Sequence, residues 1–392
     1  MKPYSFNVII ISVFIILSFS CRNHSTDIPV INASKSYPEK EIFLNDIANI
    51  SYVSMRPDGN YLYSGSIYRV SESRIIICDA QSGDILFFSR EGNPISRFNN
   101  KGRGPGEYLF PMEAMYDEKT DELFLVDMGS IKVYSSSGIF KRGLPLPEGA
   151  MVLNHIVSFD ERSLFFYDLK KSYMRGGVDA KDLSESDYRE PYYLVSKADG
   201  EILDYFEMAI KPVSLSLDID GFRAAARVRH LIKSDEGVFI CNPQNDTIFL
   251  YARDRSLTPV FAKTPEVSSM NPMVFINNCV ELGQYQFTEL CTIKRGDPIP
   301  GFFPMDYYMR DKKSGEIFRQ RLRVHEYKDK ELFISPLALW RRLYDNGCVL
   351  ELDLLELKEA YDNNLLSGKL KELVETLDED DNNVFVFVEF KN

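Results

Sequence analysis

A strand-rich unit recurs along this chain and constrains its fold more than any other feature. Each copy has an apolar strand ending in Asp or Asn, a second strand rich in aromatic residues, a turn and a third strand. Self-similarity at about 40–50 residues, with several strands per unit, is typical of β-propeller blades. The first strands of the five copies, the last of them more divergent, are residues 74–79, 122–127, 163–168, 237–242 and 287–293.

The two ends of the chain supply the remaining strands. Residues 42–53 predict one or two strands, and residues 348–350 and 383–390 predict two more. A closed ring removes exposed sheet edges, so we expect both ends to share one blade. The sequence therefore predicts an all-β fold over residues 41–392, a six-bladed β-propeller, with seven blades as the alternative.

A helical insertion is predicted within the last blade, at about residues 351–377. Its leucines recur at helical spacing, and the pattern is interrupted near Asn363-Asn364 and at Gly368. We expect two short amphipathic helices whose apolar faces pack on the propeller. Presentation of those faces to a partner is the alternative.

The first 21 residues indicate export. Lys2 precedes an apolar run, Val8 to Leu17, which is shorter than the roughly 20 residues of a membrane-spanning helix. Residues 1–20 therefore predict a signal peptide, and Cys21 at the cleavage position predicts an acylated lipoprotein. Ser18 stands where a lipoprotein signal usually has leucine, so plain secretion and an uncleaved anchor are the alternatives. Residues 21–40 are polar and predict a flexible tether.

Charge and cysteine content argue against two kinds of function, nucleic-acid binding and zinc binding. The formal net charge of −12 argues against nucleic acid as a partner. The cysteines beyond Cys21 lack the close spacing of a zinc site. Cys279 and Cys291 flank a predicted turn near Gly283, so a disulfide across that hairpin is one possibility. Small buried side chains are the favoured interpretation for all five, Cys78, Cys241, Cys279, Cys291 and Cys348.

The loop 101–108 (KGRGPGEY) is the most distinctive short motif. It lacks the Lys-Ser/Thr ending of a phosphate loop and the glycine spacing of a dinucleotide fingerprint. We expect a rigid connection between blades, with glycines at positive φ and a proline fixing the turn. The alternative is a contact with a ligand or partner, in which Arg103 and Glu107 line an axial opening. The residues involved would be Arg103, Gly104, Pro105, Gly106, Glu107 and Tyr108.

Two histidines occupy equivalent places in successive copies. His155 and His230 each lie five residues before an Asp-Glu pair that precedes a repeat strand. Both could therefore face the central channel, where two imidazoles and a carboxylate could hold a cation. Hydrogen-bonded residues of inner strands are the favoured interpretation, and no metal or other cofactor is predicted.

Arginines alternate along one predicted strand, at Arg319, Arg321 and Arg323, so their side chains share a face. On an outer strand they would protect an edge by charge. Near the channel they would form an anion site, to which Arg227 and Arg229 could add. The sequence contains no Gly-x-Ser-x-Gly elbow and no cysteine beside an evident base, so no catalytic residue is predicted.

Together these features resemble the six-bladed β-propeller lipoproteins of Bacteroidetes-type bacteria, which are related in architecture to NHL-repeat propellers. The resemblance rests on Cys21, on residues 92–98 followed by the loop 102–108, and on the acidic tail 380–384 before an apolar strand. The loop reproduces the family's Gly-x-Gly-Pro-Gly-Glu-Tyr, whereas Asn383 replaces a usual proline. Over residues 40–392 the resemblance implies this fold and a location in the cell envelope. It supplies no catalytic residues.

The sequence thus predicts a non-enzymatic binding or scaffold propeller, lipid-anchored to the outer membrane, for a protein, peptide or glycan partner. Such a protein could work beside an outer-membrane uptake or secretion system. The alternative is a propeller lyase or hydrolase with a metal in the channel. Residues 22–25 lack the acidic cluster associated with surface export in such bacteria, which favours the periplasmic face.

Overall fold

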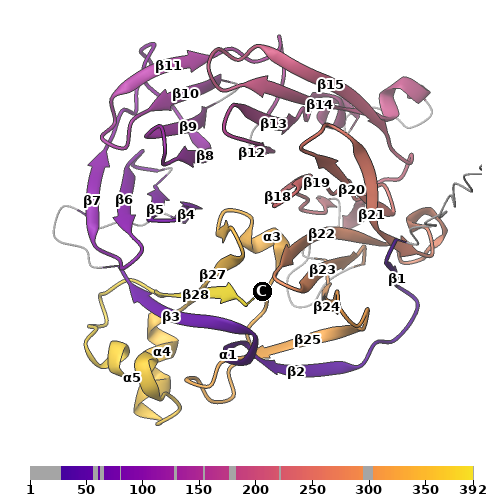
Figure 1. The fold of residues 1–392 in the computed structure, drawn as a ribbon. Coiled ribbons are helices and arrows are strands. Elements are labelled where there is room, and N and C mark those ends of the chain that lie inside the picture. Colours follow the sequence, from indigo (N-terminus) through magenta and orange to yellow (C-terminus); the bar gives the residue numbers. More distant parts are fainter. Residues whose placement is uncertain are drawn as a thin grey trace, which may run out of the picture.

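Six β-sheets of four or five strands stand around one axis in a computed structural model (Figure 1). The structure describes residues 28–55, 61, 66–79, 81–127, 130–152, 155–175, 182–219, 222–294 and 303–391. The prediction of an all-β, six-bladed propeller is confirmed, and the seven-bladed alternative is wrong.

Blades 1 to 3 follow one another along the chain, and in each the first strand lies nearest the axis (Figure 1). Blade 1 contains β4 (Ser66–Val70), β5 (Arg74–Cys78), β6 (Ile85–Ser89) and β7 (Pro94–Phe98). Blade 2 contains β8 (Pro111–Asp117), β9 (Glu122–Asp127), β10 (Ser130–Tyr134) and β11 (Phe140–Leu144). Blade 3 contains β12 (Ile156–Ser158), β13 (Ser163–Tyr167), β14 (Arg189–Ser196) and β15 (Ile202–Ala209).

Blades 4 to 6 repeat this order, and the last one borrows its outer strand from the N-terminal region. Blade 4 contains β18 (Leu231–Ser234), β19 (Gly237–Ile240), β20 (Thr247–Ala252) and β21 (Leu257–Thr264). Blade 5 contains β22 (Val274–Leu282), β23 (Tyr285–Thr292), β24 (Met305–Asp311) and β25 (Ile317–Arg323). Blade 6 contains β26 (Leu343–Tyr344), β27 (Gly347–Leu352), β28 (Val384–Phe390) and β3 (Ala48–Ser54).

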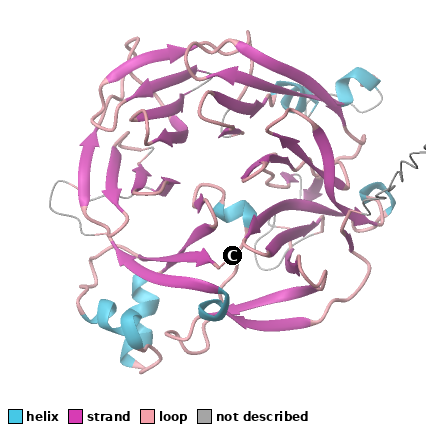
Figure 2. Cartoon of the chain, viewed as in Figure 1, coloured by secondary structure: helices cyan, strands magenta, loops and turns pink. Residues whose placement is uncertain are grey.

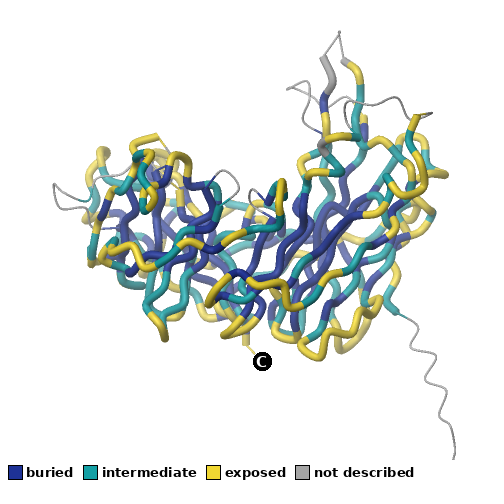
Figure 3. The backbone as a smooth tube through the Cα atoms, turned by 90° about the horizontal axis from the view of Figure 1, so that it is seen from above, coloured by how far each residue is buried: buried dark blue, intermediate teal, exposed yellow. Residues whose placement is uncertain are grey.

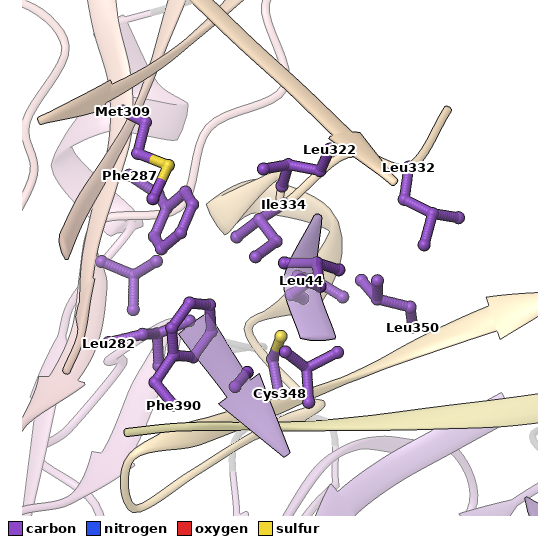
Figure 4. Packing of buried hydrophobic residues seen from close by; sticks show 14 of the residues in the cluster. Leu44, Leu282, Phe287, Met309, Leu322, Leu332, Ile334, Cys348, Leu350 and Phe390 are labelled. Carbon is purple, nitrogen blue, oxygen red and sulfur yellow. The ribbon is translucent and has the colours of Figure 1, made fainter. Parts of the chain in front are cut away.

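The middle strands are apolar on both faces because each blade lies between two others. Alternate side chains of β5 enter different cores: Ile75 and Ile77 pack with blade 6, whereas Ile76 packs with blade 2. A strand buried on both faces reads as a continuous apolar run, which is why these strands were visible in the sequence. Figure 3 accordingly shows buried residues concentrated along the strands, and Figure 4 shows the core shared by blades 5 and 6.

The N-terminal residues run around the outside of blades 4, 5 and 6. β1 (Val30–Asn32) pairs in parallel with β21, and β2 (Glu39–Phe43) pairs in parallel with β25. The short helix α1 (Leu44–Ile47) then leads into β3 (Figure 1). We call residues 30–54 the N-terminal belt. The predicted tether is therefore wrong for residues 30–32 and 39–40, where Ile31 is fully buried and holds the chain against blade 4.

The two ends of the described chain close the ring. β3 pairs antiparallel with β28 along its whole length, from Ser54 opposite Val384 to Ala48 opposite Phe390. This is the shared blade that the terminal strands predicted. Closure therefore makes blade 6 from strands of both ends of the chain, whereas blades 1 to 3 each consist of consecutive strands.

Helices lie mainly outside the ring (Figure 2). The predicted insertion is confirmed as α4 (Leu354–Asp362) and α5 (Gly368–Glu375), whose buried Leu357, Leu370 and Val374 join the core of blades 5 and 6. The other helical segments are α2 (Lys170–Arg175), α3 (Pro336–Leu339), η2 (Glu185–Tyr188) and η3 (Val267–Ser269). A hairpin of β16 (Ser216–Ile219) and β17 (Phe222–Ala225), which was not predicted, joins blades 3 and 4. Within the described residues no helix has the length and apolar character to cross a membrane.

The favoured interpretation of the cysteines, as small buried side chains, is confirmed. Cys78, Cys241, Cys279, Cys291 and Cys348 are all buried free thiols. Cys279 lies opposite Thr288 and Cys291 lies opposite Phe275, so the two are not cross-strand partners. The disulfide considered between them is absent from this part of the chain.

The belt should contribute measurably to stability. Ile31 is fully buried against blade 4, whereas the adjacent Val30 is 44 % exposed. We expect Ile31→Ala to lower the free energy of unfolding by about 2–4 kcal/mol, because it leaves a cavity in the core. Val30→Ala, the matched control, should change it by less than about 0.5 kcal/mol. Chemical denaturation measures both, and equal effects would mean that the belt does not stabilise the ring.

Candidate functional site

A cavity of about 410 Å³ lies on the propeller axis. The inner strands of all six blades contribute to its wall, together with the turns that follow them. This volume lies within the range of about 300–1,000 Å³ found for small-molecule sites. Because the inner strands converge here, side chains that are far apart in sequence meet at one place.

A segment between blades 5 and 6 fills the axis at one end of this cavity. It carries α3 toward the middle of the ring (Figure 1), and Trp340 directly after α3 lines the cavity. Two polar contacts hold the segment: Ser335 Oγ donates to Glu289 Oε2 at 2.5 Å, and Ile334 N donates to Gln320 Oε1 at 3.1 Å. The cavity therefore has a fixed inner end, while its other end is surrounded by exposed turns.

Three arginines surround one buried glutamate at that inner end. Glu113 of β8 is fully buried. Arg69 of β4 approaches its Oε1 at 3.5 Å, and Arg229 and Arg341 each approach its Oε2 at 3.7 Å. The guanidinium of Arg229 lies 3.4 Å from the ring centroid of Trp340, and that of Arg341 lies 4.4 Å from it. We call these five residues the axial arginine cluster.

The axial arginine cluster carries more positive than negative charge. Burial raises the pKa of Glu113, although the three arginines oppose that shift. Burial also lowers the pKa of Arg229 to about 9, which still leaves it charged at neutral pH. No hydrogen bond from the described residues reaches Glu113 Oε2. One carboxylate therefore faces three guanidinium groups in a region where water is scarce.

The predicted loop 101–108 lies elsewhere. It connects β7 to β8, and none of its residues lines the axial cavity. Arg103 and Pro105 are exposed, whereas Tyr108 is fully buried and donates to Gly83 O. These positions agree with a structural connection between blades rather than an axial opening.

The reason for the loop's glycines differs from the expected one. None of Gly102, Gly104 and Gly106 has a positive φ, so that expectation is wrong. Instead, the Glu107 carboxylate folds back on the loop and accepts from Gly104 N at 2.7 Å. A Cβ at Gly102 would lie 2.0 Å from Glu107 Oε2, so glycine there permits a close approach.

His155 and His230 do come together, as their equivalent positions suggested. Their rings lie 5.1 Å apart, and His230 N donates to His155 Nδ1 at 3.3 Å. Both are buried, the His230 ring stacks on Tyr167, and neither lines the axial cavity. The described residues contain no group of three or more His, Cys, Asp or Glu side chains arranged to hold a metal.

The arginines of β25 lie on the outside of blade 5, away from the axis. Arg319 pairs with Asp306, Arg321 with Glu331 at 2.7 Å, and Arg323 with Glu41 at 3.1 Å. β2 covers the edge of this strand. Each arginine is thus neutralised by a carboxylate, and the anion-site alternative for Arg319, Arg321 and Arg323 is wrong.

Most of the axial arginine cluster was not singled out from the sequence. Arg229 was named as a possible addition to an anion site, whereas Arg69, Glu113, Trp340 and Arg341 were not. Trp340 is the sole tryptophan of the sequence, and this was the one local signal available.

The buried histidines should make stability depend on pH. Burial lowers the pKa of both, that of His230 to about 3, whereas an unfolded histidine titrates near 6.5. Below about pH 6.5 the unfolded chain gains protons that the folded chain does not, so stability is highest above that pH and falls as the pH drops toward 3.

We expect His230→Phe, which keeps a ring against Tyr167, to remove part of this dependence. The loss of stability between pH 6.5 and 5.5 should shrink by about 1 kcal/mol, because the unfolded histidine is already half protonated at pH 6.5. Denaturation midpoints across this range measure it. His325→Asn changes an exposed histidine, 53 % accessible, and should keep the wild-type dependence. An unchanged slope in His230→Phe would contradict the assignment.

The fold is similar to solved structures from Bacteroides. A chain of Bacteroides fragilis described as exported is 17 % identical, with a TM-score of 0.63, over 93 % of this chain and 100 % of that one. A DUF4221 family member from Bacteroides vulgatus is 11 % identical, with a TM-score of 0.49, over 88 % of this chain and 98 % of that one. At 17 % identity, the likeness to the Bacteroides fragilis chain concerns the fold alone.

No curated protein sequence matches the chain. A protein-family model does match it, over residues 28–389, which include the N-terminal belt and all six blades. The chain therefore belongs to the family described as a domain of unknown function, DUF4934.

Proposed function

We propose that this protein is an exported binding propeller that holds a ligand in its axial cavity without transforming it. The observation that carries the proposal is the cavity itself: six blades and the α3 segment converge on one concave space, lined by charged residues and Trp340. Concave sites of this size with a few convergent polar groups are the usual form of ligand pockets.

The ligand would be a small molecule or the end of a protein, peptide or glycan. The ring supports this role, because inner strands that line the cavity, such as β4, are packed on both faces. A site on such strands keeps its geometry without the ligand, so little ordering is needed on binding.

An enzyme with a channel metal has less support. The two histidines considered for it pack against Tyr167 outside the cavity. The described residues also offer no third ligand beside them.

For location, we propose lipid anchoring through Cys21 to the cell envelope, at the periplasmic face of the outer membrane. Cys21 lies outside the described residues, and the support is the signal-like pattern before it. The N-terminal belt begins at Val30, on the outer edge of blade 4. An anchor preceding it would leave the axial cavity clear of the attachment point.

Filling the cavity should abolish binding. Ser158, at the end of β12, lines the cavity, and Ser314 lies on an exposed turn at the outer edge of blade 5. A ligand bound in the cavity raises the melting temperature by mass action. In a thermal-shift panel of amino acids, peptides, sugars and organic acids, we expect one class to stabilise the wild type and Ser314→Trp but not Ser158→Trp. A shift that persists in Ser158→Trp, or a panel without any shift, would refute the proposal.

Lipid anchoring has a direct test. We expect the wild type and Cys78→Ala, a variant of a core cysteine, to incorporate a labelled fatty acid and to sediment with membranes. Cys21→Ser should lose the label, because the acylated thiol is absent. Label retained in Cys21→Ser would contradict the anchor. Resistance to protease added to intact cells is expected for the periplasmic face.

A further inference from the structure

The charges around the axial cavity are segregated by depth. Arg69, Arg229 and Lys197 line it with side chains that are 15 %, 3 % and 8 % exposed. The carboxylates at its mouth lie on the turns after the inner strands, where Glu72, Asp160, Asp235 and Asp345 are exposed. The interior of the cavity is therefore basic, although its mouth is acidic.

The remaining acidic residues of the wall already have partners. Glu118 accepts from Ser73 N at 2.9 Å, and Asp117 pairs with Lys197 at 3.3 Å. Glu281 pairs with Lys312 at 2.9 Å, and Glu161 pairs with Lys119 at 2.5 Å. Asp117 therefore offsets the charge of Lys197, whereas no described ion pair joins these carboxylates to Arg69, Arg229 or Lys233.

Lys233 of β18 is the cation placed to meet a ligand. Its side chain is exposed into the cavity, and no described carboxylate forms an ion pair with it. Desolvation, and then the nearby positive charge of Arg69, lowers its pKa, with smaller contributions from Lys197 and Arg253; Asp345 acts in the opposite direction. Cations from opposite sides of the ring thus face the same space.

The depth of a charge in the cavity determines how strongly it interacts with a ligand. Charges near an exposed mouth are weakened by water and salt, whereas charges in an enclosed region interact several times more strongly. Among the described residues, Glu113 is the carboxylate that forms ion pairs with Arg69, Arg229 and Arg341. Lys233 forms no ion pair with a described carboxylate, and the carboxylate that acts on it is Asp345 at the mouth. A ligand with negative groups would supply the missing charge.

We infer that the axial cavity binds a small molecule carrying at least two oxyanion groups, such as a di- or tricarboxylate or a phosphate ester, through Lys233, Arg69 and Arg229. This rests on the proposed binding function and names its ligand class. Guanidinium groups suit carboxylate and phosphate alike, since they offer parallel N–H donors. The acidic mouth disfavours long polyanions, whose remaining charges would stay beside it.

The first test uses defined probes in titration calorimetry at low ionic strength. Citrate represents the polyvalent anion, inorganic phosphate the single oxyanion centre, and glucose a neutral molecule of similar size. We expect citrate to bind more tightly than phosphate and glucose not to bind. Glucose binding as tightly as citrate, or no binding of either anion, would overturn the inference.

Two lysine variants separate the interior from the mouth. Lys233→Met should weaken citrate binding by about tenfold or more, because it removes a charged contact. Lys119→Met lies at the mouth, where Lys119 is 79 % exposed and paired with Glu161, and should stay within about twofold of the wild type. Equal affinities in the two variants would overturn the inference.

A third variant should act in the opposite direction. Glu113→Gln removes the negative charge beneath the cavity, so citrate should bind severalfold more tightly, as long as melting curves show a folded protein. Weaker binding in a folded Glu113→Gln would count against the inference. If this variant does not fold, the comparison of citrate affinity in Lys233→Met and Lys119→Met tests the inference instead. A neutral ligand that binds the wild type but not Ser158→Trp, together with no binding of citrate, would support the proposed binding function. The same result would contradict the inferred specificity for anions.

Discussion

Burial of both faces of every sheet is the constraint on which this structure depends. A four-stranded sheet of this size cannot cover its own apolar surface, so each blade uses its two neighbours. Alternate side chains along β5 enter the cores shared with blades 6 and 2, and the same pattern runs around the ring. The arrangement is complete only when the first and last sheets also meet. β3 and β28 provide that closure, because they place strands from the two ends of the chain in one blade.

The sequence predicted the parts of the fold that this constraint makes apolar. The middle strands are buried on both faces, and their runs of isoleucine and phenylalanine were visible at the blade spacing. The inner strands were harder to see, because β12 and β26 are short and part of each faces a polar cavity. The first part of the belt, before residue 42, was missed for a related reason: β1 buries a single side chain, Ile31, between two exposed residues. Pairing between distant strands leaves no local pattern.

The candidate site was less predictable than the fold. His155 and His230 were found because the repeat places them at equivalent positions, and they do lie together. Arg69, Glu113, Arg229 and Arg341 come from four separate segments of the chain, and each looks ordinary in its own segment. The arginines of β25 formed a more conspicuous pattern. Alternation along a strand shows only that side chains share a face, and here each of those arginines is paired with a carboxylate. The ring geometry decides which charges gather at the axis, so only the structure separates the outer arginines from the axial ones.

The N-terminal belt affects the order in which the molecule can assemble. Residues 30–54 are among the first to be synthesised, yet their partners β21, β25 and β28 are made much later. Domains tend to fold as their residues emerge, whereas contacts between distant segments form slowly. The N-terminal belt therefore remains without its strand partners until β21, β25 and finally β28 have been synthesised. A chaperone that held this segment during synthesis would protect the stage at which the chain is most exposed to wrong pairing.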